Sequence, residues 1–464
     1  MKKKLGGEKE EMKTKIATLL GIAIVLCSLF LVATLPATAI GQSQTTQKVS
    51  APSGVTTASE DDYVLGVYGN ANEDDTIDMR DLTYVKLIFF GKKPETELAD
   101  AKYDGEINPL DFVQIKMIIV GKEKELTVLG NDPMKKSQNL AVTIKKPVNR
   151  IVIADIWAYR EAEALRALNV ADKIVGVTEE VREKKVEFPE LCELPSIGKA
   201  FGWSPDFEAI LDLKPDLLMV MPSPGRVDYA EKLPGVTVLC LDLVSPTRES
   251  IPERMMVRGY IFDREEEARE YGEWHDDVMK TINEAINEQT TGISEDDLPR
   301  VVYGGPSDGN KLFRVHIGST IGQLLDYIPC KNIGKNLPQP RGAHPKVDVE
   351  WLLMQDPEVI ICPITWGSSS GYETDDTVEA KQNIQNICEL PGFEGVTAVK
   401  DGKVYALFSI TGPGYPINIA YLAKIIYHDL ALDPYAIHQE YLDRFQHIDF
   451  DVHEQGVFVY PPLE

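Results

Sequence analysis

S-P-D-F-E-A-I-L-D-L-K-P-D-L-L-M-V-M-P, residues 204–222, has a counterpart in K-V-D-V-E-W-L-L-M-Q-D-P-E-V-I-I-C-P, residues 346–363. Glu208 and Glu350 lie 142 residues apart, and the prolines that follow them keep the same spacing. Each copy predicts a short helix that ends before a proline, followed by a buried parallel strand with a continuous apolar run. The repeat therefore predicts an α/β fold with two related, Rossmann-like lobes.

Between the two copies, residues 252–286 carry apolar side chains at helical spacing over most of their length. Gly259 and Gly272 weaken this helix slightly without setting a turn. We expect one long helix that joins the lobes as a stiff hinge, with the ligand site in the cleft between them. The predicted boundaries are 138–250 for the N-terminal lobe, 251–290 for the connecting helix and 297–464 for the C-terminal lobe.

The first 40 residues have the features of an export signal. Several lysines precede an uninterrupted apolar run from Ile16 to Val32, and small residues follow at Ala37 and Ala39. We expect cleavage near Ala39, although the run is also long enough to remain as an N-terminal membrane anchor. Residues 41–60 are small and polar and predict a flexible linker. The protein is therefore expected outside the cytoplasm, either secreted or anchored at the outer face of the membrane.

The charge and the cysteines exclude several classes of function. A net charge of −25 and a pI near 4.8 oppose binding to nucleic-acid backbones and anionic lipid headgroups. Five cysteines follow the apolar run, they form no C-x-x-C pair, and an odd number cannot all pair. A dense disulfide framework and a zinc knuckle are both disfavoured.

Residues 61–130 contain two calcium-type loops whose final aspartates, Asp81 and Asp111, lie 30 residues apart. Calcium takes six to eight oxygen ligands, which such a loop supplies from positions 1, 3, 5, 7, 9 and 12. In the second loop, Lys102 occupies a ligand position, so calcium binding there should be weak or absent unless this side chain swings out. An amphipathic helix follows each loop and ends at Gly91 or Gly121. The predicted ligands are Asn70, Asn72, Asp74, Thr76, Asp78 and Asp81 in the first loop and Asp100, Asp104, Asn108 and Asp111 in the second.

This small all-α module resembles a dockerin over about 60 residues. The resemblance implies bound Ca²⁺ and a cohesin-type protein partner at the cell surface, and Lys102 departs from the pattern. The alternative is a module that folds on calcium and has no partner. Because dockerins often accompany carbohydrate-active enzymes, a dockerin-bearing enzyme of a surface complex is the competing function for the whole chain.

From about residue 142 to the end, the chain resembles the helical-backbone class of ABC-importer substrate-binding proteins, which includes iron-siderophore and cobalamin binders. The resemblance rests on the repeat and on I-V-I-A-D, D-R-E-E-E-A and V-Y-A-L-F-S, in this order and spacing. It implies that Glu208 and Glu350, one on each lobe, dock on arginines of the membrane permease. The alternative for these two glutamates is a solvated charge on a helix face.

Ligand contacts are expected from loops at the strand ends that face the cleft. Aromatic faces and arginines would grip a planar or carboxylate-rich chelate, whereas any one of these aromatics could instead belong to the core or the rim. The candidates are Trp157, Tyr159, Arg160, Phe201, Trp203, Tyr303, Arg314, Arg341, His344, Trp366 and Tyr372.

Two competing chemistries have less support. The histidines do not form a three-histidine and carboxylate set for a bare metal ion, although H-I-D-F-D-V-H at 447–453 would alternate along one strand face, as a metal site or as an exposed polar face. No G-x-S-x-G, H-E-x-x-H or P-loop motif is present, so we do not expect an enzyme. The sequence therefore predicts an extracytoplasmic solute-binding protein that captures an iron chelate or a corrinoid for an ABC importer.

Overall fold

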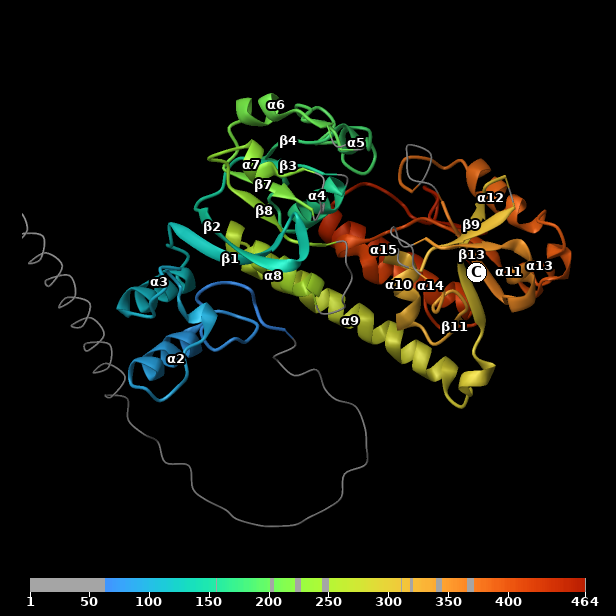
Figure 1. Ribbon diagram of the computed structural model, residues 1–464, viewed down its shortest axis with the longest axis horizontal. Coiled ribbons are helices and arrows are strands. Elements are labelled where there is room, and N and C mark those ends of the chain that lie inside the picture. The colour runs from blue at the N-terminus through green and yellow to red at the C-terminus, as the bar shows by residue number, and fades with distance from the viewer. Residues whose placement is uncertain are drawn as a thin grey trace, which may run out of the picture. The chain divides into compact units, whose positions relative to one another are not determined.

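Figure 1 shows the computed structural model of the chain. It describes residues 63–155, 157–200, 204–221, 227–243, 250–309, 311–317, 320–338, 344–364 and 371–463. The expected export signal and linker, residues 1–60, lie outside the described residues. Where the chain is described, no helix has both the length and the apolar character needed to cross a bilayer. By its internal contacts the chain divides into two compact units, Met1–Val128 and Leu129–Glu464.

The first unit contains α2 (Met79–Phe89), η1 (Glu97–Ala99) and α3 (Pro109–Ile119). Each of the two longer helices starts with a capping box: Asp78 pairs with Asp81 in α2, and Asn108 pairs with Asp111 in α3. In such a box the side chains of the two residues satisfy backbone N–H groups that the first turn leaves without partners. Both helices therefore begin where their loops end, as the sequence predicts.

The N-terminal lobe of the second unit is built on a four-stranded parallel sheet in the order β4-β3-β7-β8. Its strands are short and wholly apolar, as expected for strands covered on both faces. A two-stranded sheet of β1 and β2 and the hairpin of β5 and β6 complete the set of strands. The strands are β1 (Glu125–Asp132), β2 (Lys135–Lys145), β3 (Ile151–Ile153), β4 (Ile174–Gly176), β5 (Gly198–Lys199), β6 (Ser204–Pro205), β7 (Leu217–Val220) and β8 (Val238–Cys240); the helices are α4 (Ala158–Ala167), η2 (Ala171–Lys173), α5 (Glu179–Arg182), α6 (Phe207–Asp212) and α7 (Tyr229–Lys232).

The C-terminal lobe has a mixed sheet in the order β12-β10-β9-β13-β14-β15, with β11 also paired to β9. Within it, β11, β9, β13 and β14 are parallel neighbours in that order. The strands are β9 (Arg300–Ser307), β10 (Leu312–Val315), β11 (Lys331–Asn332), β12 (Lys346–Asp348), β13 (Val359–Pro363), β14 (Val404–Leu407) and β15 (Val459–Tyr460). The helices are η3 (Glu295–Asp297), α10 (Thr320–Leu324), η4 (Leu325–Tyr327), α11 (Val349–Gln355), α12 (Val378–Cys388), η5 (Phe393–Gly395), α13 (Thr397–Lys400), η6 (Gly412–Gly414), α14 (Tyr415–Ile426), α15 (Pro434–Tyr441) and the π-helix η7 (Leu442–Gln446).

The two lobes share one strand order. If the parallel strands of each lobe are numbered along the chain, both sheets follow the order 2-1-3-4. The sequence repeat falls on equivalent elements, because α6 leads into β7 and α11 leads into β13, the third parallel strand of its lobe. The predicted α/β fold is therefore confirmed, and the repeat supplies the same helix and strand to both lobes.

The connecting segment is not one continuous helix, and this prediction was wrong. It forms α8 (Ser250–Phe262) and α9 (Glu265–Thr290), which are separated at Asp263 and Arg264. Asp263 has a φ of 57°, and the backbone N–H of Arg264 donates to the carbonyl of Gly259 at 2.8 Å. A left-handed residue followed by this hydrogen bond is the Schellman pattern that ends a helix.

A distant lysine stabilises the break. The buried ammonium of Lys146 donates to the carbonyl of Tyr260 at 2.6 Å and to the carboxylate of Asp263 at 2.7 Å. It thereby satisfies a carbonyl that the end of α8 leaves without an intrahelical partner. The second helix, α9, contacts the C-terminal lobe, where the Tyr271 hydroxyl donates to the carbonyl of Pro413 at 2.8 Å.

Candidate functional site

In the N-terminal lobe, polar side chains gather where the parallel strands end. A cavity of about 10 Å³ lies among residues that follow β3 and β4 and residues of the β5–β6 hairpin. Such a volume is about that of one water molecule. It is lined by Asp155, Thr178, Lys199 and Tyr229, among others.

Two of these residues show signs of a functional position. Asp155 is only 3 % exposed and has a φ of 92°, a left-handed conformation that is costly for a residue with a side chain. The hydroxyl of Thr178 is buried, with no hydrogen-bond partner among the described residues. Sequence reasoning missed both residues. The aspartate that ends I-V-I-A-D could have been found, because it directly follows a buried strand.

In the C-terminal lobe, two histidines lie together at the strand ends. The rings of His316, after β10, and His344, before β12, have centroids 4.4 Å apart, and Tyr303 of β9 packs edge-on against His316 at 5.3 Å. Burial lowers the pKa of His316 to about 4, and the charges of His344 and Arg314 add to the effect. Burial also lowers the pKa of His344. Both imidazoles are therefore neutral near pH 7, and each has a nitrogen lone pair that could coordinate a metal. Sequence reasoning named His344 and missed His316.

Four of the predicted ligand residues lie in the interior. Tyr159, Arg160, Tyr303 and Tyr372 are between 2 % and 6 % exposed. The guanidinium of Arg160 contacts Glu163 at 2.8 Å and donates to the carbonyl of Ser409 at 2.9 Å. As they stand, these four side chains belong to the core and offer little surface to a ligand. Their expected role in ligand contact is therefore not supported.

The remaining predicted residues have different positions. Trp157 is partly exposed at the start of α4, and Arg314 is exposed on β10, so both can face a ligand. Glu208 and Glu350 are exposed in the first turns of α6 and α11. Phe201, Trp203, Arg341 and Trp366 lie outside the described residues.

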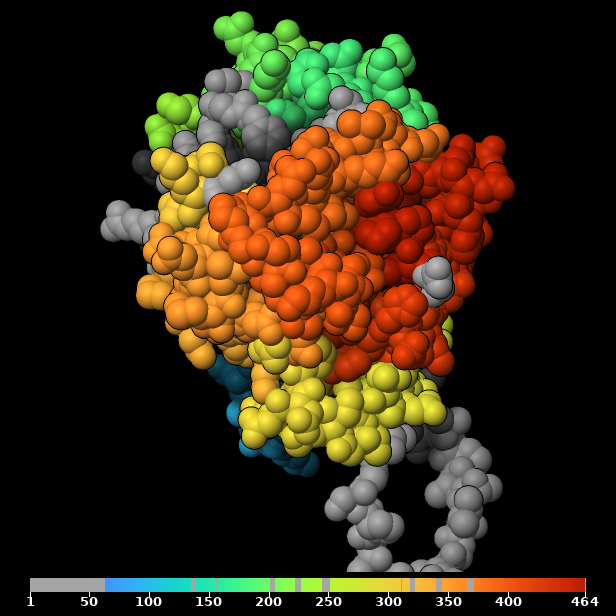
Figure 2. Space-filling model, turned by 90° about the vertical axis from the view of Figure 1, so that its right-hand side faces the viewer, coloured from blue at the N-terminus to red at the C-terminus, as the bar shows by residue number. Residues whose placement is uncertain are grey.

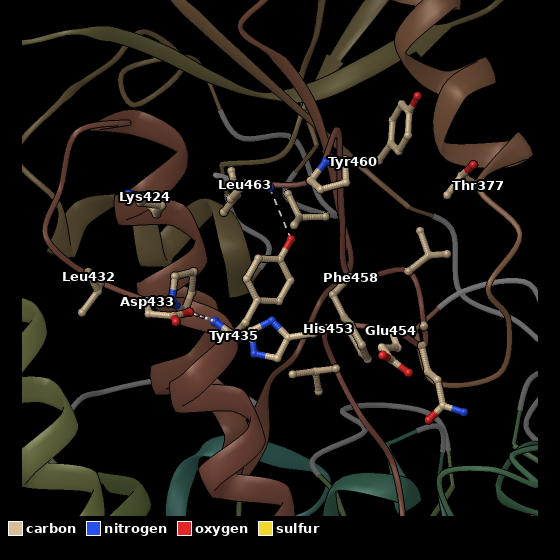
Figure 3. A pocket seen from close by; sticks show the side chains of 17 residues that line it. Thr377, Lys424, Leu432, Asp433, Tyr435, His453, Glu454, Phe458, Tyr460 and Leu463 are labelled. Atoms are coloured by element: carbon tan, nitrogen blue, oxygen red, sulfur yellow. Dashed lines mark hydrogen bonds between the residues drawn. The ribbon is translucent and has the colours of Figure 1, made fainter.

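The alternating H-I-D-F-D-V-H segment does not form a strand, so the expected strand face is wrong. His447 follows η7 in a left-handed conformation, with a φ of 50°, and the chain then turns. His453 instead packs its ring on Tyr435, with centroids 5.4 Å apart, in a cavity of about 570 Å³ in the C-terminal lobe (Figure 3). The hydroxyl of Tyr435 accepts a hydrogen bond from the backbone N–H of Leu463 across this cavity, at 3.3 Å.

Two segments that are distant in sequence meet beside this cavity. Gly371 forms an antiparallel bridge with Val457, and the N–H of Gly456 donates to Asp375 at 2.7 Å. Figure 2 shows this lobe, with its orange and red segments side by side. Neither His316 nor His344 lines this cavity, so it is distinct from the strand-end site.

The first calcium-type loop has one feature that fits a cation. The carboxylate of Asp81 accepts hydrogen bonds from the N–H groups of Asn72 and Asp78, while Oδ1 of Asn72 is buried without a hydrogen-bond partner among the described residues. An oxygen of this kind would be satisfied by a bound cation. Against this, Arg80 already forms an ion pair with Asp74 at 3.1 Å.

The second loop repeats these backbone hydrogen bonds but has Lys102 where the first loop has Asn72. The carboxylate of Asp111 accepts hydrogen bonds from the N–H groups of Lys102 and Asn108. The ammonium of Lys102 points out of the loop and lies 3.9 Å from the carboxylate of Glu125. Across the described residues, no group of three or more His, Cys, Asp or Glu side chains is placed to hold a metal ion.

Comparison with solved structures identifies similar folds. The TroA-like periplasmic binding protein FepB from Veillonella parvula aligns with a TM-score of 0.54 and 18 % identity, over 71 % of this chain and 98 % of that chain. MolA of Haemophilus influenzae, solved with molybdate, aligns at 0.52 and 17 %, over 69 % and 98 %. CeuE of Helicobacter pylori, solved with a nickel–histidine complex, aligns at 0.50 and 18 %, over 71 % and 97 %. At these identities the likeness shows the fold alone.

Sequence comparison supplies the family. A search among curated proteins finds no significant match. The family model described as periplasmic binding protein matches residues 156–411, which is more than half of the chain and spans both lobes. Proteins of this family bind substrates for transport and are not enzymes, so the competing prediction of a carbohydrate-active enzyme has no support. The chain belongs to the periplasmic binding protein family.

Proposed function

We propose that this protein is the extracytoplasmic solute-binding component of an ABC importer and that it captures a metal chelate, either an iron chelate or a corrinoid. The observation that carries the proposal is the pair of lobes with one strand order. The strand ends of one lobe carry the buried Thr178 hydroxyl, which has no partner among the described residues, and those of the other lobe carry a histidine pair. Ligands of such α/β sheets bind outside the carboxyl ends of the strands.

The chemistry of the strand ends supports a metal-bearing, anionic ligand. Neutral imidazoles suit transition metals, and the exposed guanidinium of Arg314 suits carboxylate groups. Proteins of the same fold have been solved with a nickel–histidine complex and with molybdate. The set of donors is too small for a bare metal ion, because two histidines leave most coordination positions to be filled by the ligand itself.

The absorption spectrum of protein purified from its native host is the most direct test of this proposal. A co-purified ferric siderophore or corrinoid would add a visible band, and titration of ligand-free protein with ferric desferrioxamine B or cyanocobalamin should quench tryptophan fluorescence. A colourless protein that neither probe quenches, and that instead binds a sugar or peptide, would contradict the chelate assignment.

We also propose that Glu208 and Glu350 dock the protein on its permease. Both are exposed, both lie in the first turn of a helix, and the two helices are equivalent in the repeat. Two anionic points on equivalent elements would fix the orientation of a two-lobed protein on a basic surface.

For the first unit we propose calcium binding and a cohesin-type partner. The outer face of α3 supports a partner, because Leu110 and Val113 in the helix and Val120 directly after it are 59 %, 40 % and 51 % exposed and recur at helical spacing. An apolar stripe of this kind is typical of a helix that docks on another protein. The alternative of a module that folds on calcium without a partner leaves this stripe without a role.

A further inference from the structure

One glutamate of the C-terminal lobe caps a turn of the N-terminal lobe. Residues 184–188 form a helical turn in which the N–H of Phe188 donates to the carbonyl of Lys184 at 2.9 Å. The first N–H groups of such a turn have no partner inside it. The carboxylate of Glu373 accepts from the N–H groups of Lys185, Val186 and Glu187 at distances of 3.0 to 3.2 Å.

The same turn makes a second contact with the C-terminal lobe. The ammonium of Lys184 lies 6.0 Å from the ring centroid of Phe408, while its ion pair with Glu187, at 2.6 Å, stays within the turn. Nearby, Arg160 donates to the carbonyl of Ser409. Phe408 and Ser409 directly follow β14, so these contacts lie at the carboxyl ends of the parallel strands.

The position of the contact matters for ligand capture. The turn follows β4 and α5, so it belongs to the carboxyl edge of the N-terminal sheet. It therefore joins the carboxyl edges of both sheets, where the ligand is proposed to bind. Arg160 is 2 % exposed, whereas Val186 is 42 % exposed and Glu373 is partly exposed. Hydrogen bonds to Glu373 can therefore exchange with water, unlike those of the buried Arg160.

We propose that Glu373 is a positioning residue for ligand capture, whose carboxylate sets the spacing between the carboxyl edges of the two lobes. This proposal rests on the proposed function in one respect, namely that the spacing of the lobes serves ligand capture. A carboxylate is well suited to this role, because it accepts several N–H groups at once and interacts favourably with the N-terminus of a helical turn. Glutamine has the same shape but keeps only one accepting oxygen, and its NH₂ group would face backbone donors.

Full-length protein carrying Glu373→Gln, without ligand, tests the proposal. Hydrogen exchange should speed up about five-fold at the amides of residues 185–187, the effect expected when a cap worth about 1 kcal/mol is lost. Energy transfer between fluorophores placed at Leu211 and Met354, which are exposed on α6 and α11, should show a broader or longer distance distribution. Glu394→Gln, an exposed glutamate of the same lobe, serves as the matched control and should change neither measurement.

Two results would overturn the proposal. Unchanged exchange at these amides would show that Glu373 does not cap the turn in solution. Faster exchange with an unchanged distance distribution would show that Glu373 caps the turn but does not set the spacing between the lobes. Titration with ferric desferrioxamine B and cyanocobalamin forms a separate arm, in which a positioning role predicts faster ligand release from the variant. If the parent protein binds neither probe, the chelate assignment fails, while the ligand-free measurements still decide the role of Glu373.

Discussion

At the scale of single residues, Lys102 decides how much the two calcium-type loops differ. Lys102 stands at a loop position where an oxygen ligand is expected, yet its ammonium lies beside Glu125 and not inside the loop. We therefore expect calcium titration of the parent protein to show one strong site and at most one weak site. Lys102→Asn should supply the missing oxygen and strengthen the second site, as measured by isothermal calorimetry. The control variant Lys116→Asn, on the exposed face of α3, should leave the affinity of the second site unchanged. Two equal sites in the parent protein would contradict this reasoning.

Glu163 should make stability depend on pH. Burial raises the pKa of its carboxyl to about 8, although Arg160 opposes the shift and Glu187 adds to it. Because this folded-state pKa lies above the ordinary value, the stabilising contribution is complete at low pH and is lost as the pH rises through about 8. The contribution therefore falls between the ordinary pKa of 4.5 and about 8, and Glu163→Gln should flatten the fall in urea midpoint over that range. Equal slopes for Glu163→Gln and the parent would refute the assignment, and Glu394→Gln controls for a change of surface charge.

At the scale of elements, the break between α8 and α9 depends on a glycine. A Cβ at Gly259 would lie 2.9 Å from Cβ of Ala268 and 3.0 Å from the carbonyl oxygen of Arg264, so the two helices could not approach as they do. Gly272, inside α9, has open space around it. Gly259→Ala should therefore destabilise the protein by about 1–3 kcal/mol.

The matched variant Gly272→Ala should stabilise the protein by about 0.5–1 kcal/mol, because alanine loses less backbone entropy in a helix. Thermal and urea unfolding of both variants measure the difference. If the two alanines had effects of the same sign and size, the close approach at Gly259 would not control the break.

At the scale of the whole molecule, Glu208 and Glu350 are expected to act together on the permease. Alanine at both positions should lower uptake through a reconstituted importer and leave ligand affinity unchanged, because both side chains are exposed on helices outside the strand-end site. Each single variant should have a smaller effect than the pair. Unchanged uptake in the double variant would show that these glutamates are ordinary solvated charges.

The features that could be predicted from the sequence are those that depend on residues close together in the chain. The repeat of residues 204–222 and 346–363 predicted equivalent helices and strands in two lobes, because apolar runs and helix-ending prolines act locally. The helices after the calcium-type loops were predicted for the same reason, since their capping residues lie within one turn. The acidic start of α9, Glu265–Glu267, is also a local signal of a helix start.

Which of the candidate side chains are buried depends on contacts that form only in the folded protein. Arg160 and Tyr372 had the right chemistry, but partners that are distant in sequence hold them in the core: the carbonyl of Ser409 for Arg160, and His438 for Tyr372. The end of α8 likewise depends on Lys146, which is 117 residues away from Asp263. Burial and helix termination at these positions are set by contacts that form only when the chain is folded, so a local reading of residue type could not find them.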